Sequence, residues 1–477
     1  MPPLLQPSST ILLPQLPPKT LVGIDLITFT STTNFHGIRD LPHGWHFLYT
    51  GTTESLSLRC GAWFYVGDLR TAGNGRDDST ALVAAHSQNT TPEIYIWRWS
   101  SESEALDTLK HGSDADRQEA MRYKANLGAT WQSGGLFRYR SRVSPSLLTA
   151  QPGSGQTVQK QDEDEDGETE ESGRRDWQGL TDRISPSLLS RIVGSPELDV
   201  DGRPRWAVTT ASTASRDADN IPGLDPSTEG PDGVSETGGE QERAFGFLPI
   251  DLKRTWREGA VGRERTEAAQ DRSWALGDLI NRCSAEAMED GQTGETQLLG
   301  ELQFTFLMVL TMMNYSCLQQ WKRLLELILT SKQAITDREG FMSDVLRLLS
   351  LQLQRCDDVE GGIFEIDGDE GGDFFRKLLM KLRASIDEIL GNDVQSAVKS
   401  ELEKLDAWVK EEYDWELHRE AIVRRGMVQL EDGEEVELEM DGHDEDEETG
   451  EYAPLVVDLG GSGMPDDGNL QDTEMGG

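Results

Sequence analysis

One stretch of this chain, residues 298–329, restricts the possible folds more than any other. It opens with the longest apolar run in the sequence, LLGELQFTFLMVLTMM. A helix that is apolar on nearly all sides must be buried on nearly all sides. The run is shorter than the ~20 residues that a membrane span needs, and Glu301 lies near its start. We therefore predict a central helix of a folded domain over residues 298–313, and no membrane span.

The residues that follow, 317–329, have the periodicity of an amphipathic helix. Leucine, isoleucine and tryptophan recur at three- and four-residue spacing, Trp321 among them, which places them on one face. Gln320, Lys322 and Arg323 fall on the other face. The pattern predicts a second helix packed against the first.

Four segments are acidic or rich in glycine, serine and proline, and contain few aliphatic residues. They are residues 141–175, 212–243, 430–451 and 460–477. Apolar burial there cannot offset a backbone entropy cost of ~1–2 kcal/mol per residue. The resulting prediction is two folded domains. The first, at 18–193, contains a disordered acidic insert at 141–175, and the second, at 245–426, contains an acidic loop at 357–373. A disordered linker at 194–244 joins them, and an acidic linker at 427–451, a strand at 452–459 and a disordered tail at 460–477 follow.

The two predicted domains differ in class. Strands are expected in the first domain where β-branched and aromatic residues alternate with turn residues, at 21–29, 45–49, 61–66 and 93–99. Helices are expected at 101–127 and 176–192, the latter with a turn at Ser185-Pro186. Further helices are expected in the second domain at 266–283, 341–353, 374–390 and 394–417. The predicted fold class is α+β, with an antiparallel, β-rich, sandwich-like N-terminal domain followed by an all-α domain.

Charge and cysteine content restrict the partners and the compartment. The formal net charge is −41, so we expect basic protein surfaces rather than nucleic acid as partners. The four cysteines form no CxxC pair, which fits a reducing compartment. Prolines interrupt the apolar N-terminal residues, and no basic region precedes them, so no signal peptide is predicted.

The residues that could carry chemistry do not form a recognisable site. His43 and His46 make an HxxH pair, but metal binding would need further ligands, and the favoured interpretation is a histidine satisfied by the fold. Two acidic runs begin like calcium-binding loops, yet Gly173 and Leu378 stand where the bidentate glutamate belongs. No phosphate-binding loop or hydrolase motif occurs. We predict no enzymatic activity, no cofactor and no metal.

Glu301 and Gln303 are polar residues within the apolar helix. Each must have a partner, because an unpaired buried polar group costs ~1–3 kcal/mol. For Glu301, the favoured interpretation is a place at the helix N-terminus, where a carboxylate interacts favourably with the helix dipole. Both residues are expected to be structural.

The β-prone segment at 452–459 has no neighbouring strands in the sequence. It could pair with the sheet of the first domain, or complete the sheet of a partner by β-augmentation. Ordering it costs roughly 8–16 kcal/mol, whereas burial of its three alternating apolar residues contributes about 4–9 kcal/mol. Such a strand binds usefully only when the folded domains dock on the same partner and raise its effective concentration. The predicted binding residues are Tyr452, Leu455, Val456, Val457 and Leu459.

Three sets of residues, in the same order along the chain, resemble the A1 cistron-splicing factor family. The first set, GID, FHGI and LPHGWHF, contains Gly23, Asp25, Gly37, Pro42, Gly44 and His46. The second set, LGELQFTF and QWKRLL, contains Glu301, Gln303, Trp321 and Arg323. The third set is APLVVDL near the C-terminus. The chain departs from the family pattern at His43, where the family usually has proline, and in its long acidic inserts.

The resemblance implies a non-enzymatic assembly factor of the U5 snRNP, with a β-rich N-terminal domain and a helical, VHS-like C-terminal domain. Family members hold the large central scaffold protein of the spliceosome by its RNase H-like and Jab/MPN-like domains, and their C-terminal strand adds to a sheet between the two. They block the RNA helicase of the particle and limit access of snRNA. The implied state is a monomer within a hetero-complex, assembled in the cytoplasm and exchanged in the nucleus, with no membrane contact and with structural roles for the signature residues. The alternative is a trafficking adaptor whose VHS-like domain binds acidic peptides through a basic groove.

Overall fold

The computed structural model describes residues 8–51, 58–69, 92–140, 160–214, 244–286, 292–356, 370–391, 396–417, 424–429 and 435–440. The chain divides into two compact units. The first is formed by Met1–Ile250 with Thr255–His418, and the second by Asp251–Arg254 with Arg419–Gly477. The first unit contains the first predicted domain and most of the second. We call its two parts the β-rich region (described residues from 8 to 214) and the helical region (described residues from 255 to 417).

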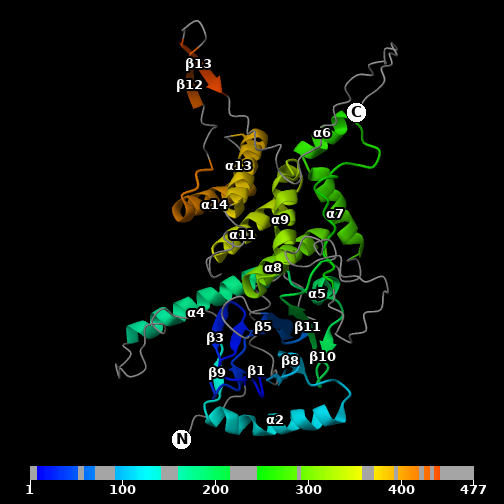
Figure 1. The fold of residues 1–477 in the computed structure, drawn as a ribbon, viewed down its shortest axis with the longest axis vertical. Helices are drawn as coiled ribbons and strands as arrows, with labels where there is room; N and C mark the ends of the chain where they lie inside the picture. The colour runs from blue at the N-terminus through cyan, green and yellow to red at the C-terminus, as the bar shows by residue number, and fades with distance from the viewer. Residues whose placement is uncertain are drawn as a thin grey trace, which may run out of the picture. The chain divides into compact units, whose positions relative to one another are not determined.

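Two β-sheets form the β-rich region (Figure 1). The first sheet has the order β8 (Ala105–Thr108), β7 (Ile94–Ser100), β1 (Thr10–Leu12), β4 (Gly37–Arg39) and β9 (Leu136–Arg138). The second has the order β10 (Glu197–Leu198), β11 (Pro204–Thr209), β6 (Arg59–Val66), β5 (Gly44–Gly51), β2 (Leu21–Ile24) and β3 (Ile27–Thr30). All neighbours in the second sheet are antiparallel, whereas β1 runs parallel to β7, and β4 to β9. The β-rich class is confirmed, but the antiparallel expectation is wrong for the first sheet.

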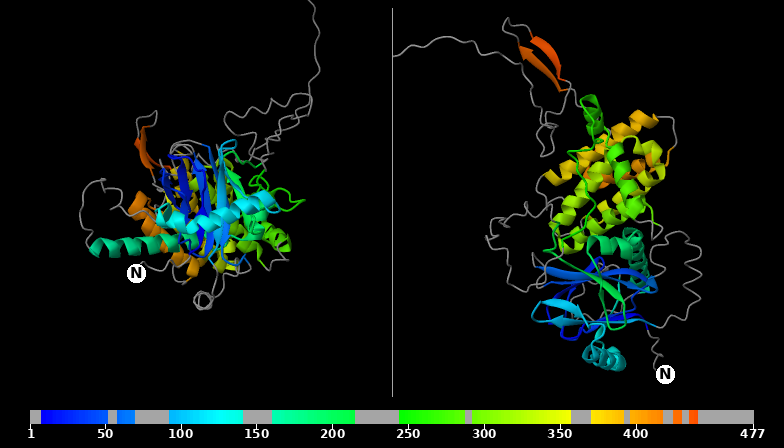
Figure 2. Two further views of the ribbon diagram at one scale, coloured as in Figure 1. Left: turned by 90° about the horizontal axis from the view of Figure 1, so that it is seen from below. Right: turned by 90° about the vertical axis from the view of Figure 1, so that its right-hand side faces the viewer.

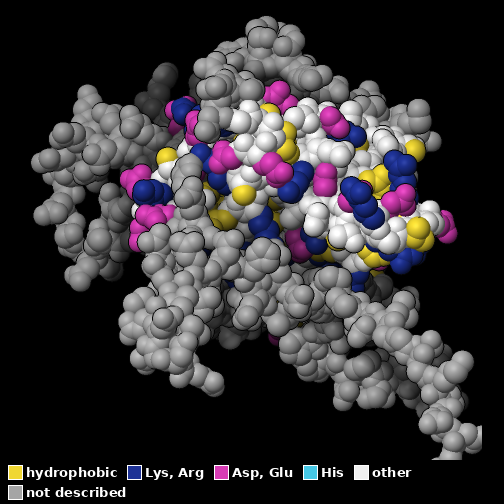
Figure 3. Space-filling view, turned by 90° about the horizontal axis from the view of Figure 1, so that it is seen from above, with side chains coloured by type: hydrophobic (Ala, Val, Ile, Leu, Met, Phe, Trp, Pro, Cys, Tyr) yellow, Lys and Arg dark blue, Asp and Glu magenta, His cyan; other side chains and the backbone are white. Residues whose placement is uncertain are grey.

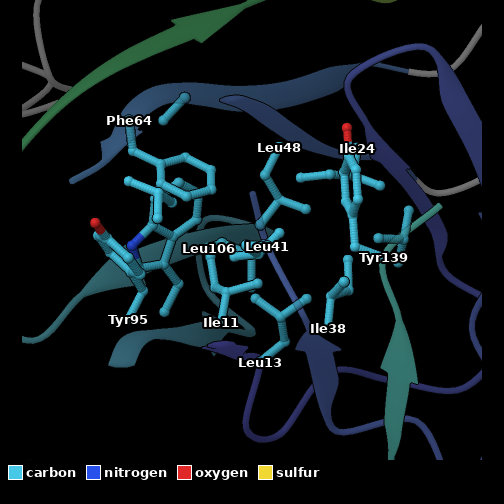
Figure 4. Packing of buried hydrophobic residues seen from close by; sticks show 14 of the residues in the cluster. Ile11, Leu13, Ile24, Ile38, Leu41, Leu48, Phe64, Tyr95, Leu106 and Tyr139 are labelled. Atoms are coloured by element: carbon cyan, nitrogen blue, oxygen red, sulfur yellow. The ribbon is translucent and has the colours of Figure 1, made fainter. Parts of the chain in front are cut away.

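The second sheet is buried on both faces. On one face, Leu48 and Phe64 pack against residues of the first sheet. Figure 4 labels several of these residues, among them Ile11 of β1 and Tyr95 of β7. On the other face, the Trp63 ring stacks on that of Trp177, 5.9 Å away between centroids, and lies 6.2 Å from that of Phe304 in the helical region. The second sheet is therefore the layer of the β sandwich that packs against the helices.

A long helix, α2 (Asp114–Gln132), covers the remaining face of the first sheet (Figures 1 and 2). Its Ala120 is buried against Leu12, Ile96 and Leu136 of that sheet, with Trp131 packed at the edge of the cluster. The layers of the β-rich region thus run from α2 through the first sheet to the second.

The helical region is built around the apolar pair that the sequence predicts. The pair consists of α8 (Gly294–Met312) and α9 (Tyr315–Leu329). The other helices are α6 (Arg263–Gln270), α7 (Ser273–Glu286), α10 (Ala334–Asp337), α11 (Glu339–Leu353), α13 (Glu370–Leu390) and α14 (Ala397–Tyr413). Nearly all of α8 is buried, as its composition demands. None of the helices in the described part of the chain has the length and apolar character of a membrane span.

Two further helices of the β-rich region lie against α8, and one of them corrects a prediction. Residues 141–175 were expected to be disordered, but α4 (Lys160–Thr181) begins within them and is followed by α5 (Pro186–Ile192). Trp177 and Leu180 are buried and anchor the second half of α4. The predicted break at Ser185-Pro186 is present, and the Ser185 hydroxyl accepts a hydrogen bond from the Leu188 amide.

The predicted linker at 194–244 is also wrong in part. Within it, β10 and β11 join the second sheet, where Trp206 pairs with Trp63 of β6. Trp206 and Val208 are buried on the face that they share with Trp63, and Arg205 is buried on the opposite face, where it donates to the Leu106 carbonyl oxygen of the first sheet. The partner strand lies far away in the sequence, so the pairing could not be seen from local composition.

Three other predicted elements have different bounds. Residues 21–29 form the β2–β3 hairpin rather than one strand, because Asp25 at the turn has a left-handed φ of 55°. Residues 101–127 contain β8 before α2, since pairing with β7 overrides the local helical preference. The predicted helix at 266–283 is divided into α6 and α7 where the Asp271 carboxylate accepts a hydrogen bond from the Ser273 amide.

Two predicted acidic segments contain regular structure. The loop expected at 357–373 ends early, because α13 begins at Glu370. In the second compact unit, β12 (Arg424–Gln429) pairs antiparallel with β13 (Glu435–Met440), with Val428 opposite Val436. The boundary predicted at residue 426 therefore falls inside a hairpin, and the linker predicted at 427–451 contains its second strand.

Candidate functional site

The strand predicted to bind a partner lies outside the described residues. Tyr452, Leu455, Val456, Val457 and Leu459 belong to this segment, so their role stays a prediction. The other predicted residues are all described, and they fall into two buried clusters. One lies within the β-rich region, and the other lies where that region meets the helical region.

The first cluster is a buried carboxylate with three partners. The Asp25 carboxylate lies 2.8 Å from Nδ1 of His46, accepts a hydrogen bond from the Tyr139 hydroxyl at 2.5 Å, and accepts another from the Phe47 amide at 2.9 Å. Asp25 and His46 are each 1% exposed. The cluster joins the β2–β3 turn to β5 and to the residue that follows β9.

The ring of His46 is held between two acceptors. Its Nε2 lies 2.9 Å from the Pro42 carbonyl oxygen, and its Nδ1 faces the Asp25 carboxylate. A carbonyl and a carboxylate can only accept, so both ring nitrogens donate and the imidazolium form is favoured. Burial opposes that charge, but the charge of Asp25 and the two hydrogen bonds outweigh it and raise the pKa of His46 above its ordinary 6.5. Because both nitrogens donate hydrogen bonds, His46 has no lone pair for a metal. The ring instead connects β5 to Asp25 and Pro42.

Because this pKa is raised by folding, His46 should make stability depend on pH. Its contribution is complete below about pH 6.5, the unfolded pKa, and is lost as the pH rises through the folded pKa. We expect urea denaturation to show a difference in unfolding free energy between the native chain and His46→Asn that narrows from pH ~6 to ~9. A difference that stays constant or widens over this range would contradict the imidazolium assignment.

Two signature glycines of the β-rich region, Gly23 and Gly37, are required by close approach, whereas Gly44 is required by its positive φ of 130°. A Cβ on Gly23 would lie 2.0 Å from the Tyr49 ring, and one on Gly37 would lie 2.2 Å from the Ile11 carbonyl oxygen of β1. Gly44 begins β5, two residues before His46. The first signature thus specifies the packing of the two sheets rather than a surface.

The second cluster lies where α5 and α8 meet, and Glu301 is at its centre. Glu301 is fully buried, and its carboxylate accepts hydrogen bonds from Arg191 Nη1 at 2.7 Å, from the Leu248 amide at 3.0 Å and from Gln320 Nε2 at 2.8 Å. It lies beyond the first turn of α8, so the helix-dipole interpretation is wrong. Gln320 is buried rather than on an outer face, because Glu301 needs its amide.

Gln303 makes a second connection to the β-rich region. Its amide oxygen accepts a hydrogen bond from the Arg183 amide at 2.9 Å, and its Nε2 donates to the Gly179 carbonyl oxygen at 2.9 Å. A Cβ on Gly300 would lie 2.8 Å from the Arg183 carbonyl oxygen. Two residues of the LGELQ motif, Gly300 and Gln303, therefore contact Arg183 in the segment between α4 and α5, and Glu301 contacts Arg191 of α5 itself. The motif thus specifies the junction.

Trp321 and Arg323 support the helical region from within. Trp321 is fully buried, and its Nε1 donates to Gln352 Oε1 at 3.0 Å. Gln352 in turn donates to the Leu302 carbonyl oxygen of α8 at 3.2 Å. Arg323 is also buried, although the helical periodicity placed it on the polar face. Both residues are inside the fold, and neither forms part of an exposed surface.

Sequence reasoning missed several residues of these clusters. Arg191, Tyr139 and Trp177 carry no local signal, because their partners lie more than a hundred residues away. Asn314 could have been found, since an asparagine between two helices is a typical N-cap. It caps α9, and its side-chain amide also donates to the Ser212 carbonyl oxygen at 2.8 Å.

The fold and the two clusters define a class of protein. It is a scaffold of a β-rich and a helical region that are held together by buried polar groups. These groups form their hydrogen bonds with other groups of the same chain. No group of His, Cys, Asp and Glu suited to a metal ion occurs in the described part of the chain.

Comparison with known proteins identifies the family. Residues 7–194 match the AAR2 N-terminal domain, and residues 247–418 match the AAR2 C-terminal repeat region. Relatives include the Protein AAR2 homologs of Homo sapiens (22% identical) and Mus musculus (21% identical), each aligned over 86% of this chain and 91% of the relative. The chain belongs to the AAR2 family. Membership supports a role within the AAR2 group of splicing and snRNP assembly factors.

Proposed function

We propose that this protein is a non-enzymatic assembly factor that binds the large central scaffold protein of the U5 snRNP, through its RNase H-like and Jab/MPN-like domains. The family match, which covers both regions of the chain, carries the proposal. While bound, the protein blocks premature engagement of the RNA helicase and of snRNA. It acts as a monomer in a hetero-complex that forms in the cytoplasm and is exchanged in the nucleus.

The junction supports this proposal on physical grounds. Binding costs less when the partner-facing surfaces are already fixed in their bound arrangement. Glu301 and Gln303 tie α8 to residues of α4 and α5, so the two regions need not be ordered at the moment of binding. The segment at 452–459 then acts as a tethered second attachment, whose effective concentration is raised once the folded regions dock.

Charge supports a protein partner over nucleic acid. The net charge of −41 opposes the approach of phosphate backbones. On the face shown in Figure 3, Lys and Arg side chains alternate with Asp and Glu among the described residues. The described residues on that face form no continuous basic stretch of the kind that the trafficking alternative would use for acidic peptides.

Affinity purification followed by mass spectrometry tests the function directly. With the full-length chain as bait, we expect the U5 scaffold protein as the main partner and the particle's helicase to be depleted. Enrichment of vesicle-coat or endosomal sorting proteins would instead favour the trafficking adaptor. Recovery of the helicase together with the scaffold would contradict the proposed competition.

A further inference from the structure

The two ends of the connection between the regions lie side by side. The chain leaves the β-rich region at residue 214 and is described again from residue 244. The Phe245 amide donates to the Thr213 carbonyl oxygen at 2.9 Å, and the Gly246 amide donates to the Ile192 carbonyl oxygen at 2.9 Å. The intervening residues, 215–243, thus start and return at the same place on the β-rich region, and their length does not set the distance between the regions.

The residues at which the chain leaves the β-rich region, up to Ala214, also contact the turn between α8 and α9 and the first residues of α9. The Ala214 amide donates to the Ser316 hydroxyl at 3.2 Å. The side-chain amide of Asn314, which is 1% exposed, donates to the carbonyl oxygens of Thr210 and Ser212 at 3.1 and 2.8 Å. The last described residues before the connection are therefore bonded to the helical region itself.

Other contacts between the two halves lie far from the connection in sequence. Arg191 pairs with Glu301, Gln303 bonds to the chain at residues 179 and 183, and Asp176 forms an ion pair with Arg355. Close packing accompanies these bonds, because Gly300 has no room for a Cβ against Arg183. Buried polar pairs and close packing of this kind are typical of a domain interior rather than of a transient contact.

We infer that residues 1–214 and 244–477 are two complementary halves held together by this interface, and that residues 215–243 are an excursion whose continuity is dispensable. The regions that match the AAR2 N-terminal domain and the AAR2 C-terminal repeat region would then form one folded unit held by non-covalent contacts, rather than two domains joined by a hinge. The inference concerns the free chain and is independent of the proposed partner.

Cleavage of the connection tests this inference. A site-specific protease sequence placed within residues 215–243 of the full-length chain allows the connection to be cut in the folded protein. We expect the cut halves to elute together in size-exclusion chromatography as one 1:1 species by native mass spectrometry. The melting temperature should stay within a few degrees of that of the uncut chain. Separation or precipitation of the halves after cutting would overturn the inference.

Gly300→Val in the same cleavable chain tests whether this interface holds the halves. The added side chain must displace the backbone at Arg183, so the cut halves of this variant should separate while the uncut chain stays monomeric. If the uncut variant does not fold, Gln303→Ala serves instead and should speed dissociation of the cut pair. Arg347→Ala on the exposed face of α11 is the control and should behave as the native chain. Cut halves of Gly300→Val or Gln303→Ala that stay together as firmly as the native pair would show that the assignment is wrong.

Discussion

Replacement of Glu301 by alanine should lower the free energy of unfolding by about 3 kcal/mol, one of the two largest effects that we expect from a small change. The substitution leaves the Arg191 guanidinium without its carboxylate at a position where only about a quarter of the side chain is exposed (24%). It also leaves the Leu248 amide without this acceptor, and removes one of the two acceptors of the Gln320 side-chain amide, which keeps its bond to the Leu248 carbonyl oxygen. Partial solvation of Arg191 keeps the loss near the lower end of the range for broken buried pairs.

Urea denaturation of the native chain and two control variants measures this effect. Glu301→Gln keeps one acceptor oxygen and the side-chain volume, so it should restore part of the loss. Glu388→Ala removes an exposed carboxylate that pairs with Lys332 at 3.2 Å, and should leave the unfolding midpoint unchanged. Equal midpoints for Glu301→Ala and Glu388→Ala would show that the buried cluster does not stabilise the junction.

The main elements of the fold could be predicted where hydrophobic pattern and burial agree. The apolar run at 298–313 became α8, and its amphipathic neighbour became α9, because burial on all sides or on one side follows from composition. The strands β5 and β6 were found for the same reason. In contrast, β11 depends on a partner strand distant in sequence, and the local composition of β11 and of the first part of α4 resembles that of a linker.

For the site, residue types could be predicted but their partners could not. The polarity of Glu301 and Gln303 within an apolar helix required partners, and the sequence offered the helix N-terminus for Glu301. The actual partner, Arg191, lies 110 residues away on α5, at a distance that no spacing rule reaches. His46 is similar: the favoured interpretation, a histidine satisfied by the fold, is confirmed, but its partners Asp25 and Pro42 could not be named from the sequence. The buried polar groups hold the scaffold in shape, and they do not face a substrate.

Replacement of Val456 and Val457 by aspartate should nearly abolish capture of the scaffold protein. In an added strand these two residues lie on opposite faces, so each aspartate places a charge on a surface that would otherwise be buried. Loss of two buried valines alone removes roughly 3 kcal/mol, which corresponds to a loss of affinity of about 100-fold or more. Val456→Thr with Val457→Thr keeps the β-branched shape, and should cost much less.

Direct binding between the purified full-length chain and a scaffold fragment containing the RNase H-like and Jab/MPN-like domains tests the central claim most directly. Isothermal titration should give a 1:1 complex for the native chain and for the threonine control. The aspartate variant should show little or no heat, although its melting temperature is unchanged. Absence of binding by the native chain would contradict the proposed function, and equal binding by the aspartate variant would contradict the role of the C-terminal strand.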